Sequence, residues 1–365
     1  MRRRRKEQPH PRGPESLAWD LAPLVVLAGT GVALLQGDGD RHKRHAPRSA
    51  ELERGRGRHA ASPRHIPQQG WKDILNRTRK EVAEDQVPLV AAGVTFYTLL
   101  ALFPGLAAFV SLYGLFADPA EAYRQLRILA FIVPAGVMDF LADQMIRLAQ
   151  GDKGGQSLGF ILGLLASIWS ANGAVKAIIT GLNIAYEEKE DRPLVTRTLI
   201  SLAFTVGFLA FVILSVALIA APPAVEAVAG PQMAAALSWI SWPILAALLT
   251  VGLALLYRYG PSREPVRWRW ITWGSGGVVA FWLLGSMLFS IYVGNFAHYD
   301  KTYGSLGAAI GLMMWIYLSA MVVLAGAELN SEIEHQTAVD TTTGPPLPMG
   351  LRRAKMADTL GAAQS

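Results

Sequence analysis

The chain has 365 residues, of which 52% are hydrophobic and 17% are charged, and its formal net charge is +6. Soluble domains usually have about a quarter of their residues charged, so this composition argues against an ordinary soluble protein. The absence of cysteine excludes disulfides, thiolate metal sites and cysteine nucleophiles. Basic loops beside a membrane explain the excess positive charge more simply than nucleic acid does, and we predict no specific nucleic acid partner.

The N-terminal region is basic and only weakly apolar. Residues 1–18 form a tail that begins with the run Arg2–Lys6, and residues 19–36 contain the apolar run Leu21–Gln36, which is interrupted by Pro23. This run is shorter than the roughly 20 residues that a transmembrane helix needs. It fits a marginal span, a segment lying at the membrane surface, or a signal-peptide core, and the sequence leaves these three open.

Two segments precede the main apolar region. Gly37–Gly70 is rich in Gly, His, Pro and Arg, so it cannot bury a core and we predict a disordered basic linker. It either attracts anionic lipid headgroups or is simply solvated. Trp71–Gln86 has apolar residues on one helical face and charged residues elsewhere, which predicts an amphipathic helix on the membrane surface.

Six apolar runs follow, each long enough for a helix to cross about 30 Å of hydrocarbon. They are Leu89–Phe116, Ser157–Ile184, Val195–Ala221, Trp239–Tyr259, Trp270–Phe296 and Tyr303–Glu328. We therefore predict an all-α fold, a polytopic transmembrane helix bundle with six core spans plus amphipathic surface helices, over residues 71–334. Residues 335–365 are polar and contain Gly344-Pro345-Pro346, which predicts a flexible cytoplasmic tail.

The connections between the runs predict the orientation. Lys and Arg are concentrated before the first run, between the second and third, and between the fourth and fifth, whereas Pro222–Ser238 has none. Because cytoplasmic loops carry the excess of Lys and Arg, both ends of the six-span core should be cytoplasmic in a bacterial inner membrane. The long connection Ala117–Gln156 has helical periodicity at 120–132 and 137–150, which predicts two short helices on the outer face.

Polar residues inside the apolar runs are the main candidates for function, because they are costly in a bilayer. The second run carries four at helical spacing, on the half predicted to be cytoplasmic: Asn172, Lys176, Thr180 and Asn183. In a functional interpretation, such a stripe lines a substrate path or takes part in an internal ion pair. In a structural interpretation, it makes hydrogen bonds between helices, and the Lys176 side chain extends to the lipid headgroups. Glu328, near the end of the sixth run, is a candidate partner for Lys176 or for Arg residues of nearby loops, or it faces water.

Further candidates lie outside the stripe. Asn295, Tyr299 and Tyr303 belong to a short polar and aromatic segment that forms either an outer gate or a turn anchored at the interface. Small residues at spacings of three and four predict close helix packing, with a homo-oligomer as one outcome; they are Gly155, Gly159, Gly163, Gly304, Gly307 and Gly311. Pro104 should kink the first helix.

No catalytic or metal-binding motif stands out, and we predict no enzyme activity, no metal and no cofactor. Glu332, Glu334 and His335 are close together, but their position at the end of the sixth run indicates a solvated helix end.

Four motifs resemble those of the YihY/BrkB family of bacterial inner-membrane proteins, once called ribonuclease BN. They are the segment 91–104; Trp169–Gly173 with Asn183–Tyr186; Leu256–Pro261; and Asn295–Phe296 with Thr302–Gly307, closed by Gly326–Asn330. The resemblance covers about residues 71–334 and implies a six-helix inner-membrane bundle, but little mechanism. The virulence-factor name refers to serum resistance in some members, and the ribonuclease name has no support from a metal-binding His/Asp cluster in this sequence.

Three functions remain open from the sequence. The first is transport or export of an unidentified substrate along the stripe, and the second is a non-transporting envelope or scaffold protein that contacts the bilayer and anionic lipids through its basic segments. The third is an enzyme such as a ribonuclease, for which RNA cleavage abolished by a change at Glu328 would be the evidence. The sequence has no recognisable inverted repeat, a feature that many transporters have.

Overall fold

The computed structural model of the chain describes residues 55–114, 156–295 and 305–364. Their regular elements are helices, with one isolated antiparallel β-bridge between Val266 and Thr342. Five helices are long and apolar enough to cross a membrane, and a sixth is added if the bent pair α2–α3 counts as one span. The predicted class, an all-α polytopic membrane bundle, is confirmed. The N-terminal tail, the marginal apolar segment, most of the basic linker and the two outer-face helices lie outside the described residues.

The long helices match the six apolar runs. They are α3 (Val87–Gly114), α6 (Gln156–Ala185), α7 (Leu194–Ala229), α8 (Pro231–Tyr259), α9 (Trp268–Asn295) and α11 (Ser305–His335). The shorter elements are η2 (Pro63–His65), the amphipathic α2 (Gln68–Glu84) and α12 (Lys355–Asp358). A helix pairs most of its backbone groups within itself, which is the condition for crossing hydrocarbon.

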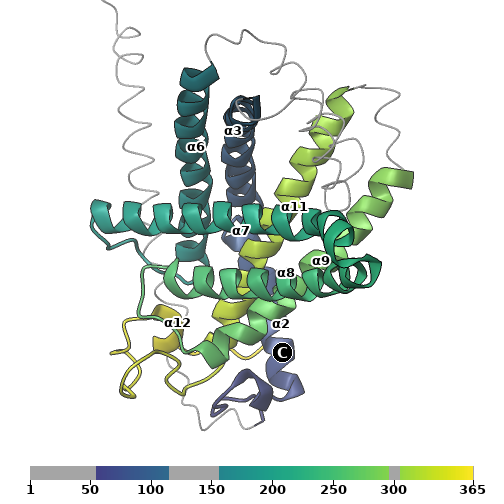
Figure 1. Cartoon of the computed structure of the whole chain (residues 1–365). Helices are drawn as coiled ribbons and strands as arrows, with labels where there is room; N and C mark the ends of the chain where they lie inside the picture. The colour runs from purple at the N-terminus through teal and green to yellow at the C-terminus, as the bar shows by residue number, and fades with distance from the viewer. Residues whose placement is uncertain (1–54, 115–155, 296–304, 365) are drawn as a thin grey trace, which may run out of the picture. The chain divides into compact units, whose positions relative to one another are not determined.

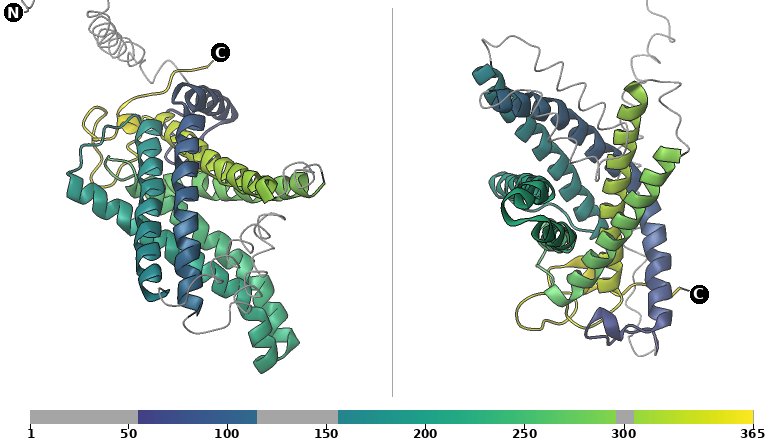
Figure 2. Two further views of the ribbon diagram at one scale, coloured as in Figure 1. Left: turned by 90° about the horizontal axis from the view of Figure 1, so that it is seen from above. Right: turned by 45° about the vertical axis from the view of Figure 1, so that its right-hand side comes forward.

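The helices pack as neighbouring pairs around α11. Helices α3 and α6 lie side by side, as do α7 and α8, and α11 packs against α2, α3, α6 and α9 (Figure 1). The pair α7 and α8 runs across the direction of α3 and α6, as both views in Figure 2 also show. Many large apolar side chains stay exposed, among them Trp239 at 81% and Leu194 at 79%. Lipid rather than water is the natural environment for such surfaces.

The connection between the third and fourth spans differs from the expected loop, Pro222–Ser238. Helix α7 continues through Pro222 and Pro223 to Ala229, and α8 begins at Pro231, so that Gly230 alone makes the turn. Gly230 has a φ of 85°, a conformation that glycine adopts without steric cost. Pro231 favours the start of a helix because its missing N–H is not needed there.

The bend near the first span lies before the expected proline kink. Helices α2 and α3 meet at 61° around Asp85 and Gln86, and Gln86 has a φ of 52°. Pro104 lies inside the continuous helix α3. Close to it, the Ser167 hydroxyl of α6 donates to the Ala101 carbonyl at 3.2 Å, which adds an interhelical hydrogen bond where the proline has removed a backbone donor.

The polar ends of several helices converge in one packed region, which we call the polar base: residues 55–86, 186–193, 260–267 and 328–364. Arg58 is 3% exposed and donates to the carbonyls of Gln336 and Gly361. Arg352 donates to three carbonyls, those of Ala338, Leu347 and Ala357. These buried guanidinium groups hold residues 336–364 in place, where the sequence predicts a flexible tail, and they order residues 55–67, where it predicts a disordered linker.

Candidate functional site

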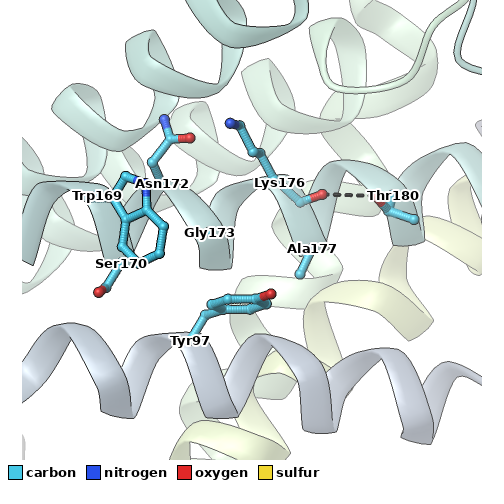
Figure 3. Close-up of a pocket in the computed structure, with 8 residues that line it drawn as sticks. All are labelled: Tyr97, Trp169, Ser170, Asn172, Gly173, Lys176, Ala177 and Thr180. Carbon is cyan, nitrogen blue, oxygen red and sulfur yellow. Dashed lines mark hydrogen bonds between the residues drawn. The ribbon is translucent and has the colours of Figure 1, made fainter.

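The predicted stripe on α6 lines a cavity for part of its length. The cavity has a volume of about 400 Å³ and is lined by Tyr97, Trp169, Ser170, Asn172, Gly173, Lys176, Ala177 and Thr180. All of these residues except Tyr97 belong to α6 (Figure 3). The structure therefore brings together three of the four predicted stripe residues, and Tyr97 of α3 is a member that the stripe pattern did not include.

Tyr97 reaches this place because α6 has a glycine opposite its ring. A Cβ atom on Gly173 would lie 2.7 Å from Tyr97 Cδ1, closer than real side chains allow. The sequence contained a signal for this contact, since Tyr97 and Gly173 lie in two of the motifs that carry the family resemblance. The tyrosine ring lies between α3 and α6, and the side chains of Asn172 and Lys176 project away from it (Figure 3).

Asn172 connects the cavity wall to the next helix. It is 5% exposed, and its side-chain amide exchanges hydrogen bonds of 3.3 Å with the hydroxyl of Ser201 in α7. The single Ser201 proton also has a closer acceptor, the Thr198 backbone carbonyl of α7 at 2.9 Å, so the bond donated by the Asn172 amide is the one that joins the helices, a common contact in lipid. Asn172 thus serves helix packing at the same time as it lines the cavity.

Lys176 has a different environment. Its side chain is half-buried and projects to the same side of α6 as Asn172 (Figure 3). Within the described ranges, Lys176 has no hydrogen-bond or ion-pair partner for its ammonium group. Thr180, the next residue of the stripe, donates to the Lys176 carbonyl at 2.9 Å, so its hydroxyl is used within the helix.

Asn183, the fourth stripe residue, does not line the cavity and instead bonds to residues of the polar base. Its amide donates to Glu190 at 3.0 Å and its carbonyl oxygen accepts from the Ser262 backbone N–H at 2.8 Å. Glu190 also accepts two hydrogen bonds of 2.7 Å from the Arg192 guanidinium. Hydrogen bonding to Arg192, and then to Asn183, lowers the pKa of Glu190 to about 2. Asn183 therefore fixes the loop after α6 to the loop after α8.

Glu328 is buried, and it forms no ion pair with Lys176. Its side chain is 1% exposed in α11, and in the part of the chain that the structure describes neither carboxylate oxygen has a hydrogen-bond donor. Ion pairs with arginines occur further along α11, at Glu332 and Glu334, which were predicted to lie on a solvated helix end. That interpretation of Glu332 and Glu334 is wrong.

The two later glutamates form buried ion pairs. Glu332 pairs with Arg77 of α2, and Glu334 pairs with Arg263 of the α8–α9 loop at 2.7 Å. Both glutamates are 2% exposed. They are shielded because the tail after His335 folds over them, which helical periodicity could not reveal.

The other predicted residues divide into two groups. Tyr299, Tyr303, Gly155 and Gly304 lie outside the described residues, and the side-chain environment of Asn295, Gly159 and Gly307 is likewise undescribed. Gly163 is half-buried in α6, and its packing role stays a prediction. A Cβ on Gly311 would meet nothing within 4 Å among the described residues. Close approaches occur at other glycines, among them Gly181 against Leu324 and Gly326 against Val278.

No group of three or more His, Asp or Glu residues that could hold a metal ion is found among residues 55–114, 156–295 and 305–364. What the described site offers is a cation, a tyrosine and a tryptophan around a partly enclosed space. The five or six helices that are long and apolar enough to cross a membrane define the chain as a polytopic α-helical membrane protein.

The particular family follows from comparison with known proteins. The sequence profile of the family described as Virulence factor BrkB matches residues 78–348, and the chain belongs to this family. Similar proteins include the ribonuclease-like protein YfkH of Bacillus subtilis (strain 168), 28% identical over 66% of this chain and 88% of the relative. A UPF0761 membrane protein of Verminephrobacter eiseniae (strain EF01-2) is 29% identical over 72% of this chain.

A further relative, the UPF0761 membrane protein NMB0524 of Neisseria meningitidis serogroup B (strain ATCC BAA-335 / MC58), is 27% identical over 69% of this chain. The matched regions span 62% of the Verminephrobacter protein and 61% of the Neisseria protein. No solved structure gives a significant match. The family resemblance expected from the motifs is thereby confirmed.

Proposed function

We propose that the chain transports or exports an anionic solute across a bacterial inner membrane, and that the cavity beside α6 is part of its path. The observation that carries this proposal is the half-buried ammonium group of Lys176, which has no counterion among the described residues. A positive charge in such a place attracts anions, because a low-dielectric wall strengthens its field.

The other residues that line the cavity favour an organic anion as the solute. Tyr97 and Trp169 offer aromatic surface, and Trp169 is 74% exposed. Aromatic rings with a few polar groups are typical linings of small-molecule sites. Asn172 and Ser170 supply further polar groups from the same helix.

A charge-selective labelling experiment tests the proposal. In this cysteine-free chain, Thr180→Cys places one thiol at the cavity, one helical turn from Lys176. We expect an anionic methanethiosulfonate to react faster than a cationic one, and we expect Lys176→Gln to remove the difference. Ile161→Cys, 51% exposed elsewhere on α6, is the control. Equal rates for both reagents with Lys176 present would contradict an anion site.

The orientation is part of the proposal. The basic loops after α6 and after α8 lie in the polar base together with α2 and the end of α11. Because cytoplasmic loops carry the excess of Lys and Arg, this face is the cytoplasmic one, and both ends of the six-span core face the cytoplasm. A reporter that is active only in the cytoplasm should therefore be active when fused after residue 364, and a reporter that is active only outside the cytoplasm should be inactive there.

A scaffold is the second candidate, and the packed polar base favours it. Buried arginines hold residues 336–364 in one conformation, which is a suitable surface for a partner or for a second copy of the chain. Basic segments would add contacts with anionic lipids. If the phenotype of a deletion strain is restored by a variant with Lys176→Gln but not by one that lacks residues 340–364, the scaffold is favoured over transport.

A further inference from the structure

Glu328 is an acid in a place where an ionised carboxylate is strongly disfavoured. It is 1% exposed, and both oxygens are shielded from solvent without a hydrogen-bond donor among the described residues. An unpaired buried charge must acquire a proton or a counterion, because the protein interior replaces none of its lost hydration. Glu328 therefore needs a bound proton or cation, and no described side chain forms an ion pair with it.

The side chains around Glu328 are themselves acidic. The carboxyl group of Asp85 lies within hydrogen-bonding range of it, and Glu81 and Glu332 add negative charge nearby. Ionised carboxylates only accept hydrogen bonds, so Asp85 and Glu328 can bond only when a proton lies between them. Two close carboxyl groups that share one proton are the usual result of such an arrangement.

The remaining charged and titratable groups nearby do not remove the need for a proton. On α11, the Glu332 carboxylate is already paired with Arg77 of α2 and approached by His335 at 3.5 Å. Tyr186, just after α6, lies with its ring against the Arg263 guanidinium, and burial raises the pKa of its hydroxyl, so that it stays neutral. The described residues include no Lys or Arg in an ion pair with Glu328.

The pair lies at the 61° bend between α2 and α3. Asp85 is the C-cap residue of α2, and the next residue, Gln86, has a left-handed φ of 52° before α3 begins. A non-glycine residue keeps such a conformation only where its surroundings enforce it. Glu328 approaches this bend from α11, which packs against both α2 and α3.

We propose that Asp85 and Glu328 form a proton-binding pair that holds the α2–α3 bend. One proton, taken from water at this face, forms an O–H bond with one carboxyl group and a hydrogen bond with the other. Its loss leaves two negative charges facing each other, which separates α11 from the end of α2 and relaxes the bend. This inference does not depend on which solute the cavity takes.

The test is a distance measurement between spin labels on the two sides of the bend. Leu75 of α2 is 56% exposed and Leu100 of α3 is 42% exposed, and both can be changed to cysteine in this cysteine-free chain. The full chain in lipid nanodiscs is measured between about pH 5 and about pH 10, which includes the range where buried carboxyl groups titrate. We expect the Leu75–Leu100 distance to shift or broaden as pH rises.

Variants decide whether the pair causes the shift. Glu328→Gln keeps a hydrogen-bond donor next to Asp85, so this variant should keep the low-pH distance at every pH. Asp85 is the less buried of the two residues, and Asp85→Asn should behave in the same way if Glu328→Gln fails to fold. Glu84→Gln, one residue from Asp85 and 48% exposed in its side chain, is the control and should respond like the parent. A distance that is independent of pH in the parent, or an unchanged pH response in Glu328→Gln, would overturn the proposal.

Discussion

Arg263 and Glu334 form an ion pair of 2.7 Å with side chains only 2% and 3% exposed. The pair joins the loop between α8 and α9 to the end of α11, and the Arg263 guanidinium also lies 4.8 Å from the centre of the Tyr186 ring. Thr341 of the tail donates to the same glutamate. Four segments therefore meet at one buried charge pair: the α8–α9 loop, the end of α11, the residue after α6, and the tail.

Removal of one partner of this pair should destabilise the protein strongly. Arg263→Met leaves the Glu334 carboxylate buried without its cation, which typically costs about 3–5 kcal/mol. The free energy of unfolding in detergent, followed by denaturant titration, measures the loss. Lys80→Met is the control, because the Lys80–Glu84 pair is exposed at 55% and 48%, and such pairs contribute about 0.3–0.5 kcal/mol. Equal losses in the two variants would refute the importance of burial here.

Two glycines of α11 should respond oppositely to alanine. A Cβ on Gly326 would lie 2.3 Å from Val278 Cγ2 and 2.8 Å from the Tyr257 hydroxyl, so Gly326→Ala should cost about 1–3 kcal/mol by overpacking. A Cβ on Gly311 meets no atom of the described residues, so Gly311→Ala should be neutral or stabilise by up to about 1 kcal/mol through helix propensity. Thermal unfolding in one detergent compares them directly. A stable Gly326→Ala protein would mean that α9 and α11 are not in close contact.

The adjacent arginines of the tail provide a matched pair of variants. Arg352 is buried and its guanidinium bonds three carbonyls, whereas Arg353 is exposed. Lysine offers a single ammonium group and cannot reproduce this geometry, so Arg352→Lys should loosen residues 338–357 and Arg353→Lys should not. Amide hydrogen exchange across this segment is the measurement, with faster exchange expected only in Arg352→Lys. Exchange that is already fast in the parent would show that the tail does not pack.

The stability that Glu190 contributes through its bonds to Arg192 and Asn183 should be lost at low pH. The pKa of Glu190 falls from 4.5 to about 2 on folding, mainly through hydrogen bonds from Arg192. A lowered pKa stabilises the folded state above pH 4.5, and the stabilisation is lost as pH falls from there toward 2. In Glu190→Gln this part of the acid dependence of the unfolding temperature should disappear. Asp191→Asn, an exposed neighbour, should keep it, and a profile for Glu190→Gln identical to that of the parent would contradict the assignment.

The sequence predicted the helices well because a bilayer imposes a simple rule of length and hydrophobicity. Each apolar run corresponds to one helix of the structure within a few residues at most ends. The exceptions are α7 and α8, which extend to Gly230, and α11, which continues past Glu328 to His335. The amphipathic α2 was also predicted, since its apolar residues follow helical spacing. Contacts between segments distant in sequence have no such periodic signal, which is why the buried pairs of Glu332 and Glu334 were missed.

The candidate site could be predicted only in part. Spacing placed Asn172, Lys176 and Thr180 on one face of a helix, and the cavity contains all three. Spacing could not show that Asn183, on the same stripe, bonds to the loops after α6 and after α8 instead of lining the cavity. Tyr97 entered the cavity through packing against Gly173, a relation between two helices that no single periodic pattern records.

The central claim is that the cavity beside α6 belongs to a path across the membrane. The most direct measurement places single cysteines at Lys176, Thr180 and Asn183, with Leu165, 60% exposed on the same helix, as the lipid-facing control. A membrane-impermeant thiol reagent is then applied from outside to intact cells and from the cytoplasmic side to inverted vesicles. We predict labelling of Lys176→Cys and Thr180→Cys from both sides, and of neither Asn183→Cys nor Leu165→Cys. Labelling of the cavity positions from one side only, or from neither, would contradict a transport path.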